Sequence, residues 1–162
     1  MNEELQVVKI GLFFVMLTLI FGIGMGVIFG VAEGSVKSYI SHKVDMHQAL
    51  HNEYSKNKIW RYAQRSHFHA TGIAAFSFGL VFLIMFSSLK RKMKKVASIL
   101  VGFGGLYPLS WFAMFILAPS IGATAAHHHV VTQGLIYIGV GGLLLGMSIL
   151  CSNLFLNMFQ EV

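Results

Sequence analysis

The fold is decided by one uncharged stretch, residues 96–160, which reads VASILVGFGGLYPLSWFAMFILAPSIGATAAHHHVVTQGLIYIGVGGLLLGMSILCSNLFLNMFQ. None of its 65 residues is Asp, Glu, Lys or Arg. A helix needs about 20 apolar residues to cross a bilayer, so this stretch predicts two membrane-spanning helices joined by a short turn. Three consecutive histidines, His127, His128 and His129, stand at that turn. Ionisable side chains at membrane depth are costly, and they therefore mark a candidate functional site.

Two further uncharged windows lie upstream, at residues 10–32 and 66–89. Together with the long stretch they predict four transmembrane helices, at about 10–31, 68–88, 97–118 and 129–152. The composition agrees, because 56% of the residues are apolar and 11% are charged, whereas soluble domains carry about 25% charged residues. We expect one all-α domain over residues 1–162, an integral membrane protein built as a four-transmembrane-helix bundle.

The polar segment 33–66 separates the first two predicted spans and carries a second helical pattern. Asp45 and Glu53 fall on one side of a helical wheel drawn over residues 36–54. A narrow arc on the other side collects Val36, Ile40, Val44, His47, His51 and Tyr54. This pattern predicts an amphipathic helical segment that lies on the membrane surface or caps the bundle.

The basic residues indicate an orientation. Five of the twelve lie between the second and third spans, at Lys90, Arg91, Lys92, Lys94 and Lys95. Short basic loops stay in the cytoplasm, so we expect both termini to be cytoplasmic, in a bacterial inner membrane. Segment 33–66 and the turn 119–128 then lie on the extracytoplasmic side. The cluster suits anionic lipid headgroups and accounts for much of the net charge of +6, so no nucleic-acid partner is expected.

With four spans, every histidine falls near the same membrane face, whichever way the chain is inserted. The eight positions are 42, 47, 51, 67, 69, 127, 128 and 129. In the second span, His67 extends a ladder of small residues (Thr71, Ala75, Gly79), and His69 points nearly opposite. In the fourth span, His127 is in phase with a small and polar stripe if the helix has already begun there. That stripe comprises Gly134, Tyr137, Gly141 and Ser148.

The clustering favours a histidine-ligated metal centre, and we expect a b-type haem for membrane electron transfer. A bis-histidine haem needs two imidazoles that face each other from different helices. The candidate ligands are His67, His69, His127 and His128, with His67 and His127 preferred. In span count and histidine placement the chain resembles the small four-helix membrane b-type cytochromes. That resemblance implies electron exchange between a quinone and a membrane redox partner.

Two other functions stay open. A bare Cu, Zn or Fe ion could be held by His47, His51, His67 and His127, since neutral imidazole ligates these metals and an i,i+4 pair can share one ion. The histidine order also resembles membrane di-iron hydroxylases, although the later boxes differ from theirs. Alternatively, the chain is a non-catalytic membrane subunit or scaffold whose histidines contact a partner or sense pH.

Other motifs narrow the choice little. The chain lacks a Walker loop, a dinucleotide glycine fingerprint, a G-x-S-x-G elbow and a C-x-x-C pair, so phosphoryl transfer, nicotinamide chemistry and serine hydrolysis have no support. A double GxxxG at Gly22, Gly26 and Gly30 predicts close helix packing. It serves packing within the chain, a homo-oligomer or assembly into a larger complex equally well. Tyr107-Pro108 predicts a kink in the third span.

Overall fold

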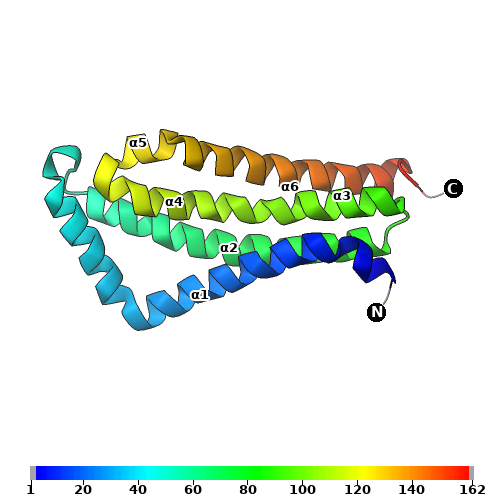
Figure 1. The fold of residues 1–162 in the computed structure, drawn as a ribbon, viewed down its shortest axis with the longest axis horizontal. Helices are drawn as coiled ribbons and strands as arrows, with labels where there is room; N and C mark the ends of the chain where they lie inside the picture. The colour runs from blue at the N-terminus through cyan, green and yellow to red at the C-terminus, as the bar shows by residue number, and fades with distance from the viewer. Residues whose placement is uncertain (1–2, 161–162) are drawn as a thin grey trace.

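The computed structural model describes residues 3–160, and its regular elements are helices (Figure 1). In chain order they are α1 (Glu3–Met46), η1 (Gln48–Leu50), α2 (Ser55–Phe86), α3 (Arg91–Gly102), η2 (Phe103–Gly105), α4 (Leu106–Ile121), α5 (Ala123–His128) and α6 (Val130–Leu156). Within these residues, four helical segments are long and apolar enough to cross a membrane. They are α1, α2, the rod formed by α3, η2 and α4, and α6. The predicted all-α chain with four apolar helices is therefore confirmed.

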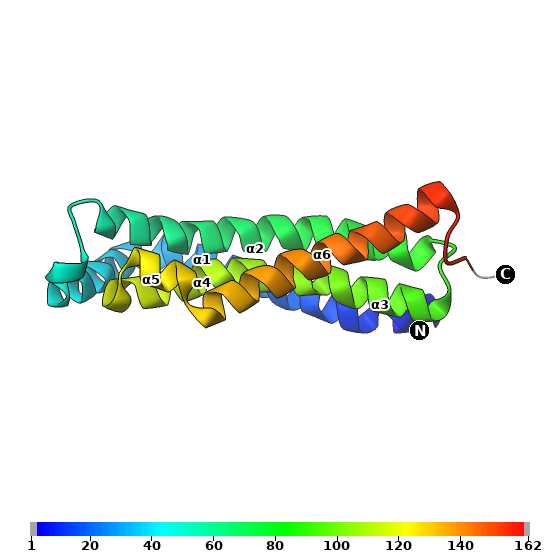
Figure 2. The same cartoon turned by 90° about the horizontal axis from the view of Figure 1, so that it is seen from above.

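The four segments form an elongated bundle with two distinct ends. The start of α1, the α2–α3 connection and the end of α6 meet at one end, which we call the lysine end (Figure 1). The α1–α2 connection and α5 lie at the other end, which we call the histidine end. Seen from above, α6 crosses the α3–α4 rod obliquely (Figure 2). Helical hydrogen bonding continues beyond the uncharged residues, so the helices are longer than the predicted spans.

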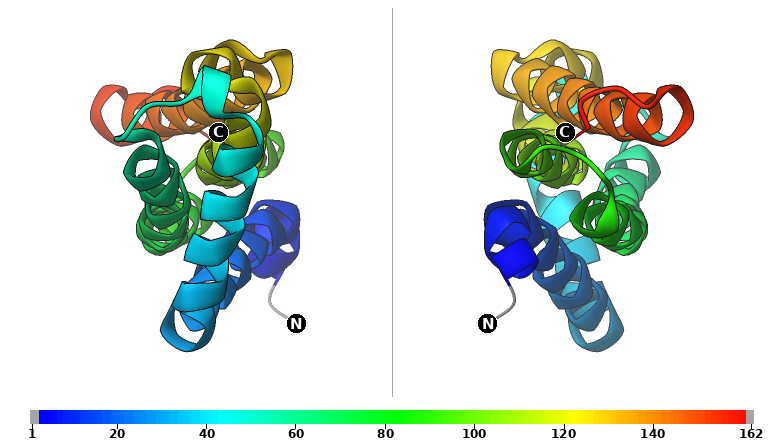
Figure 3. Two further views of the ribbon diagram at one scale, coloured as in Figure 1. Left: turned by 90° about the vertical axis from the view of Figure 1, so that its left-hand side faces the viewer. Right: turned by 90° about the vertical axis from the view of Figure 1, so that its right-hand side faces the viewer.

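The first helix bends sharply at Ala32, whose backbone leaves the helical region (φ −135°, ψ 24°). The limb beyond the bend, residues 33–46, turns across the end of the bundle (Figure 3, left). We call this limb the cap. Ile40 and Val44 are its buried side chains, so the predicted amphipathic capping helix is confirmed. The cap ends at Met46, whereas the predicted pattern continued to residue 54. A 3-10 turn follows the cap, and Tyr54 is 69% exposed.

The cap covers an apolar cluster of its own. The buried members of this cluster come from the cap, α2, α4 and α5, and are Ile40, Val44, Ile59, Tyr62, Ala63, Met114, Phe115, Ala118 and Ala126. Where this end of the protein is surrounded by water, full burial of a side chain as large as Ile40 contributes roughly 1.5–3 kcal/mol to the stability of the fold. The cluster therefore fixes the start of α2 against the end of α4.

Glycines bring α1 close to α2. A Cβ on Gly22 would lie 2.9 Å from the Thr71 backbone nitrogen, and one on Gly26 would lie 2.8 Å from Cε1 of His67. Gly30 has open space instead, with no atom within 4 Å. The double GxxxG motif thus serves packing within the chain at its first two glycines, as small residues do between membrane helices.

The third segment changes helical type in its middle. The residues Phe103–Gly105 form a 3-10 turn between α3 and α4. Pro108 follows three residues later and has no amide hydrogen to donate to the carbonyl of Gly104, which weakens regular α-helical bonding there. The sequence predicts a kink at Tyr107-Pro108; the structure has the 3-10 turn just before this pair, and both residues lie within α4.

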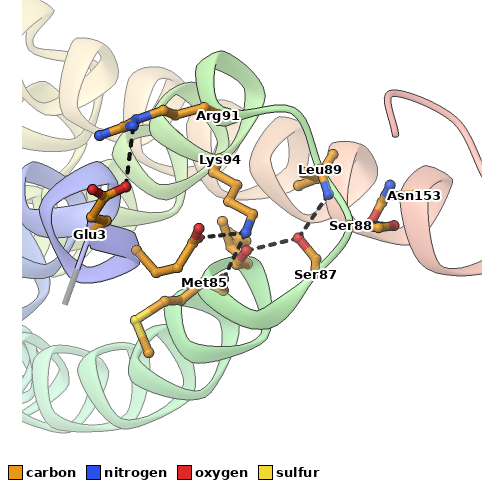
Figure 4. A network of polar contacts seen from close by, with 10 residues as sticks. Glu3, Met85, Ser87, Ser88, Leu89, Arg91, Lys94 and Asn153 are labelled. Atoms are coloured by element: carbon orange, nitrogen blue, oxygen red, sulfur yellow. Dashed lines mark hydrogen bonds and ion pairs between the residues drawn. The ribbon is translucent and has the colours of Figure 1, made fainter. Parts of the chain in front are cut away.

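The lysine end is locked by a polar network (Figure 4). Nζ of the buried Lys94 donates to Oε2 of Glu4 at 2.6 Å and to the carbonyl of Met85 at 2.9 Å. Ser88 Oγ donates to Oδ1 of Asn153 at 3.3 Å, which ties the α2–α3 connection to α6. A buried ammonium group without these acceptors would be costly, so the contacts hold α1, α2 and α3 in register.

Candidate functional site

A pocket of about 580 Å³ opens at the histidine end, between α2, α4 and α5. We call it the histidine-end pocket. It is lined by Tyr54, Lys58, Arg61, Tyr62, Arg65, Trp111, Met114 and His127. Lys58, Arg61 and Arg65 follow each other at i, i+3 and i+7, so a single face of α2 presents all three cations to the pocket.

These three cations have no acidic partners. Among residues 3–160, no ion pair involves Lys58, Arg61 or Arg65. The Arg65 guanidinium lies over the Trp111 ring, 4.7 Å from its centroid, in a cation–π contact. The pocket is therefore strongly positive, and its charge is directed at an open volume rather than at a carboxylate.

The acids of this end are used elsewhere or stand outside the pocket. Asp45 pairs with Lys56 at 2.8 Å, and Glu33 pairs with Lys37 in the cap. The hydrogen bond from the Lys56 ammonium lowers the pKa of the Asp45 carboxyl below its usual value. Glu53 is exposed and does not line the pocket. Within residues 3–160, no carboxylate therefore lines the pocket that holds the three cations.

Trp111 lies at the centre of an aromatic wall. Its ring stacks on His69 with centroids 5.9 Å apart, and it contacts the rings of Tyr62 at 5.8 Å and Tyr107 at 6.3 Å. Its indole nitrogen is buried and has no hydrogen-bond partner within the described residues. An indole N–H can only donate, and leaving a buried donor unpaired costs roughly 1–3 kcal/mol. Trp111 also lines the histidine-end pocket.

The two preferred haem ligands face different neighbours. His67 lies at the α1–α2 interface, where Nδ1 donates to the carbonyl of Gly22 at 2.8 Å and the ring packs on Gly26. His127 belongs to α5 and reaches the histidine-end pocket. His69 points away from His67, as predicted, and its ring lies against Tyr107 and Trp111. The structure therefore does not bring His67 and His127 together as a facing pair.

The other histidines mostly serve local structure. His47 Nδ1 donates to the carbonyl of Lys43 at 3.0 Å, and His51 Nε2 donates to the carbonyl of Pro119 at 2.9 Å. His127 and His128 are exposed, with ring centroids 5.0 Å apart, and His42 is exposed on the cap. Across residues 3–160, no three His, Cys, Asp or Glu side chains gather in a geometry that could hold a metal ion. The predicted set of His47, His51, His67 and His127 is thus dispersed.

One argument for His127 was wrong. It assumed that the last helix has begun by residue 127, but α6 begins at Val130. His129 has an extended backbone (ψ 138°) and its Nδ1 accepts the amide hydrogen of Val131, so it caps a new helix. The small and polar stripe with which His127 was expected to be in phase faces outward, because Tyr137 is 71% exposed and nothing lies within 4 Å of a Cβ on Gly134 or Gly141. His127 reaches the pocket from α5 instead.

The sequence reasoning missed the cations of the pocket. Their spacing over residues 58–65 places Lys58, Arg61 and Arg65 on one helical face, and this pattern is visible in the sequence. The pairing of that face with Trp111 depends on the tertiary fold and is not visible there. A comparison of the chain with protein-family models, curated proteins and solved structures found no match.

Proposed function

We propose that this chain is a four-span integral membrane protein of a bacterial inner membrane, with its lysine end in the cytoplasm. The four apolar helices support the span count. The basic residues from Lys90 to Lys95 lie at the same end as the start of α1 and the end of α6, and the positive-inside rule assigns such a cluster to the cytoplasm. The histidine end then faces the extracytoplasmic side.

The orientation can be tested with single cysteines. In a background that carries Cys151→Ser, we expect a membrane-impermeant maleimide added to intact cells to label His42→Cys and to leave Lys90→Cys unlabelled until the membrane is opened. Both positions are exposed, so access to the reagent depends on the side of the membrane alone. The reverse labelling pattern would place the histidine end in the cytoplasm.

At the histidine end, the proposed activity is binding of a small multivalent anion. The observation that carries it is the set of three unpaired cations around one pocket, next to an indole N–H without an acceptor. Arginine guanidinium groups bind phosphate or carboxylate oxygens through paired hydrogen bonds, and Lys58 adds a compact point charge.

The binding proposal is tested by intrinsic fluorescence, because the chain has only two tryptophans. Trp60 packs on Phe29 away from the pocket lining, so Trp60→Phe leaves Trp111 as the only indole reporter. Titration of this variant with pyrophosphate at low ionic strength should give a saturable change in emission. Arg61→Gln and Arg65→Gln should each weaken binding by about tenfold or more, because each removes a charge-assisted hydrogen bond.

Lys43→Gln is the matched control, since it removes one positive charge from the same end without altering the pocket lining. Its affinity for pyrophosphate should stay within about twofold of the parent, the effect of a distant screened charge. If the parent shows no saturable change, or if Lys43→Gln and Arg65→Gln weaken binding equally, the pocket is not an anion site.

A histidine-ligated centre is the second candidate, and one observation favours it. His47, His51 and His67 each donate one ring N–H to a backbone carbonyl, which leaves the other nitrogen with a free lone pair, as in metal-bound histidines. Within one chain, His67 and His127 do not fit the two axial positions of a haem, because they lie at different interfaces. His69 and His127 both lie on the α4 side of α2.

Haem and bare Cu, Zn or Fe therefore stay predictions with a direct test. Optical spectra of the oxidised and dithionite-reduced protein should show a Soret band if haem is bound, and elemental analysis should show a stoichiometric metal if a bare ion is bound. If the protein shows neither a Soret band nor a bound metal, anion binding and the scaffold role are the functions that stay open. Electron transfer with a quinone has support only if the Soret band is present.

A further inference from the structure

A second pocket with basic walls lies at the lysine end, on the seam between α1 and α3. Its volume is about 270 Å³. The first turns of the two helices supply its lining, which consists of Gln6, Val7, Lys9, Ile10, Arg91, Lys92 and Lys95. We call it the lysine-end pocket. It lies at the opposite end of the bundle from the histidine-end pocket.

Most of its positive charge is uncompensated. Arg91 faces Glu3 at 3.9 Å, at the limit of an ion pair, and both side chains are well exposed. Among residues 3–160, no ion pair involves Lys9, Lys92 or Lys95. The other acid nearby is engaged, since Glu4 binds the buried Lys94. Three lysines therefore surround a pocket that holds no carboxylate.

The backbone adds to the positive potential. The helix α3 begins at Arg91, and its N-cap residue Lys90 offers no side-chain hydrogen bond to the first turn. Helix N-termini carry a partial positive charge and favour anions, so basic residues in that turn are unfavourable unless an anion is present. The sequence nevertheless places Arg91 and Lys92 in that turn and Lys95 at the start of the next. An anion in the pocket would offset both sources of repulsion.

The position of the pocket along the bundle sets its depth. On α1, Lys9 is the last charged residue before the uncharged run 10–32, and on α3, Lys95 is the last before the uncharged run 96–160. Both lysines line the pocket, together with the apolar Val7 and Ile10. In a membrane, the point at which charge ends on two neighbouring helices marks the level of the lipid headgroups.

An apolar groove continues along the same seam, deeper in the bundle. Its volume is about 280 Å³, and its lining is Phe14, Leu17, Thr18, Phe21, Gly102, Phe103, Gly105, Leu106 and Leu109. Leu17 follows Ile10 by seven residues and Gly102 follows Lys95 by seven, so each pair shares one helical face across the two pockets. Seven residues correspond to about 10 Å of helix, so the groove lies within acyl-chain reach of the lysines.

We propose that the α1–α3 seam binds an anionic glycerophospholipid. The phosphate-bearing headgroup sits in the lysine-end pocket against Lys9, Lys92 and Lys95, and one acyl chain lies in the apolar groove beside Leu17 and Phe103. The combination of a basic pocket at headgroup depth and an apolar groove beneath it matches an amphiphile. A free phosphate would occupy only the lysine-end pocket and would leave the apolar groove empty. The site does not depend on the function proposed for the histidine end.

Native mass spectrometry of the full chain in detergent tests this proposal. The probes are phosphatidylglycerol, phosphatidylcholine and inorganic phosphate. We expect one phosphatidylglycerol to stay bound at concentrations where phosphatidylcholine does not, and millimolar phosphate to leave it in place. Each juxtamembrane lysine strengthens attraction to an anionic headgroup by about fivefold, so the triple variant Lys9→Gln, Lys92→Gln, Lys95→Gln should weaken binding on the order of 100-fold.

Two matched variants distinguish the site from general charge and from a simple phosphate site. Lys58→Gln, Arg61→Gln, Arg65→Gln removes three charges from the histidine end and should leave phosphatidylglycerol binding unchanged. Leu17→Trp fills the groove and should weaken phosphatidylglycerol binding while all lysines remain. Equal binding of the two lipids, displacement of phosphatidylglycerol by phosphate, or full binding by the lysine triple variant would overturn the proposal. Circular dichroism and maleimide labelling verify that each variant is folded and correctly oriented.

Discussion

The two ends of the bundle are both rich in cations, but they surround those cations with different neighbours. At the lysine end, the acids hold the fold together, as Glu4 does with Lys94, and the remaining lysines lie above an apolar groove. At the histidine end, Asp45 tethers the cap to Lys56 of α2, Glu33 pairs with Lys37 within the cap, and the remaining cations face a wall of aromatic rings. The comparison shows that the groups beside a cation, more than its charge, decide which kind of anion it suits.

The histidines sharpen the same comparison. They are the feature that distinguishes the histidine end in the sequence, yet several of them act as hydrogen-bond donors or caps for the backbone. His51 joins the α1–α2 connection to the end of α4, and His129 starts α6. Among residues 3–160, Lys58, Arg61 and Arg65 at that end have no ion-pair partner, and the indole N–H of Trp111 has no hydrogen-bond acceptor. The groups at this end that could bind a ligand are therefore cationic and aromatic side chains rather than the hydrogen-bonded histidines.

The largest expected effect concerns the seam at the lysine end. A Cβ on Gly11 would overlap the backbone carbonyl of Ser98, which cannot move without shifting α3. Gly11→Ala should destabilise the protein by about 3 kcal/mol, the upper range for overpacking. A chain of this size should then lose roughly 6–12 °C in Tm. Gly30→Ala near the bend is the control, since nothing lies within 4 Å of its Cβ, and its Tm should not fall.

A smaller loss is expected when the buried ammonium of the lysine end is removed. Lys94→Gln breaks the contact with Glu4 and leaves the Met85 carbonyl with a weaker donor. We expect a loss of roughly 1–3 kcal/mol, because one partner is buried and the other half-exposed. Lys92→Gln in the pocket should change stability by no more than about 0.5 kcal/mol. Chemical unfolding in detergent measures both, and equal losses would mean that the buried pair has no special role.

A third prediction separates hydrogen bonding from stacking at the histidine end. Trp111→Phe keeps an aromatic ring against Arg65 and His69 but deletes the indole N–H. It should weaken pyrophosphate binding by about tenfold, the value of one hydrogen bond to a charged acceptor at its lower limit. Calorimetric titration measures the affinity without relying on tryptophan emission. An unchanged affinity would show that the indole N–H does not contact the anion.

The smallest effect concerns the tether of the cap. Because the Lys56 contact lowers the pKa of Asp45, the tether is fully present above the unfolded-state pKa and is lost as the pH falls through the lower folded-state value. Trp60 packs near the cap, so its emission in a Trp111→Phe background should change as the pH falls below the usual aspartate pKa of about 3.9, far from the usual range of histidine titration. The same titration of Lys56→Gln should lack this component. If both proteins respond alike, other carboxyls cause the change.

The sequence predicts the fold well where composition alone decides it. Long segments without charged residues can lie only in lipid or in a protein core. The four apolar segments and the basic connection at Lys90–Lys95 can therefore be recognised from the sequence alone. The capping helix is visible too, because Ile40 and Val44 repeat with the helical period. The sharp bend at Ala32 is not, because the flanking Gly30 and Gly34 only permit a bend, whereas packing of the cap against α2 and α4 sets its angle.

The candidate site is predicted less well, for two physical reasons. The helical face on which a histidine lies depends on where its helix begins. Because the helix is broken at His129, His127 belongs to α5 and does not lie on the face that a continuous α6 would give it. The histidine-end pocket forms where the cationic face of α2 contacts Trp111 of α4. These residues are far apart in the sequence, so the sequence does not reveal the contact. His67 illustrates the same limit, because its partner is the backbone of Gly22, which no side-chain pattern reveals.

The bend in α1 has a mechanical consequence. Two helical limbs meet at Ala32: the first packs on α2 through Gly22 and Gly26, and the cap packs over the end of the bundle through Ile40 and Val44. No loop separates the two limbs. A change in the tilt of the first limb within the bilayer would therefore displace the start of the cap. Bilayer thickness, which sets that tilt, thereby becomes a variable that acts on the histidine end.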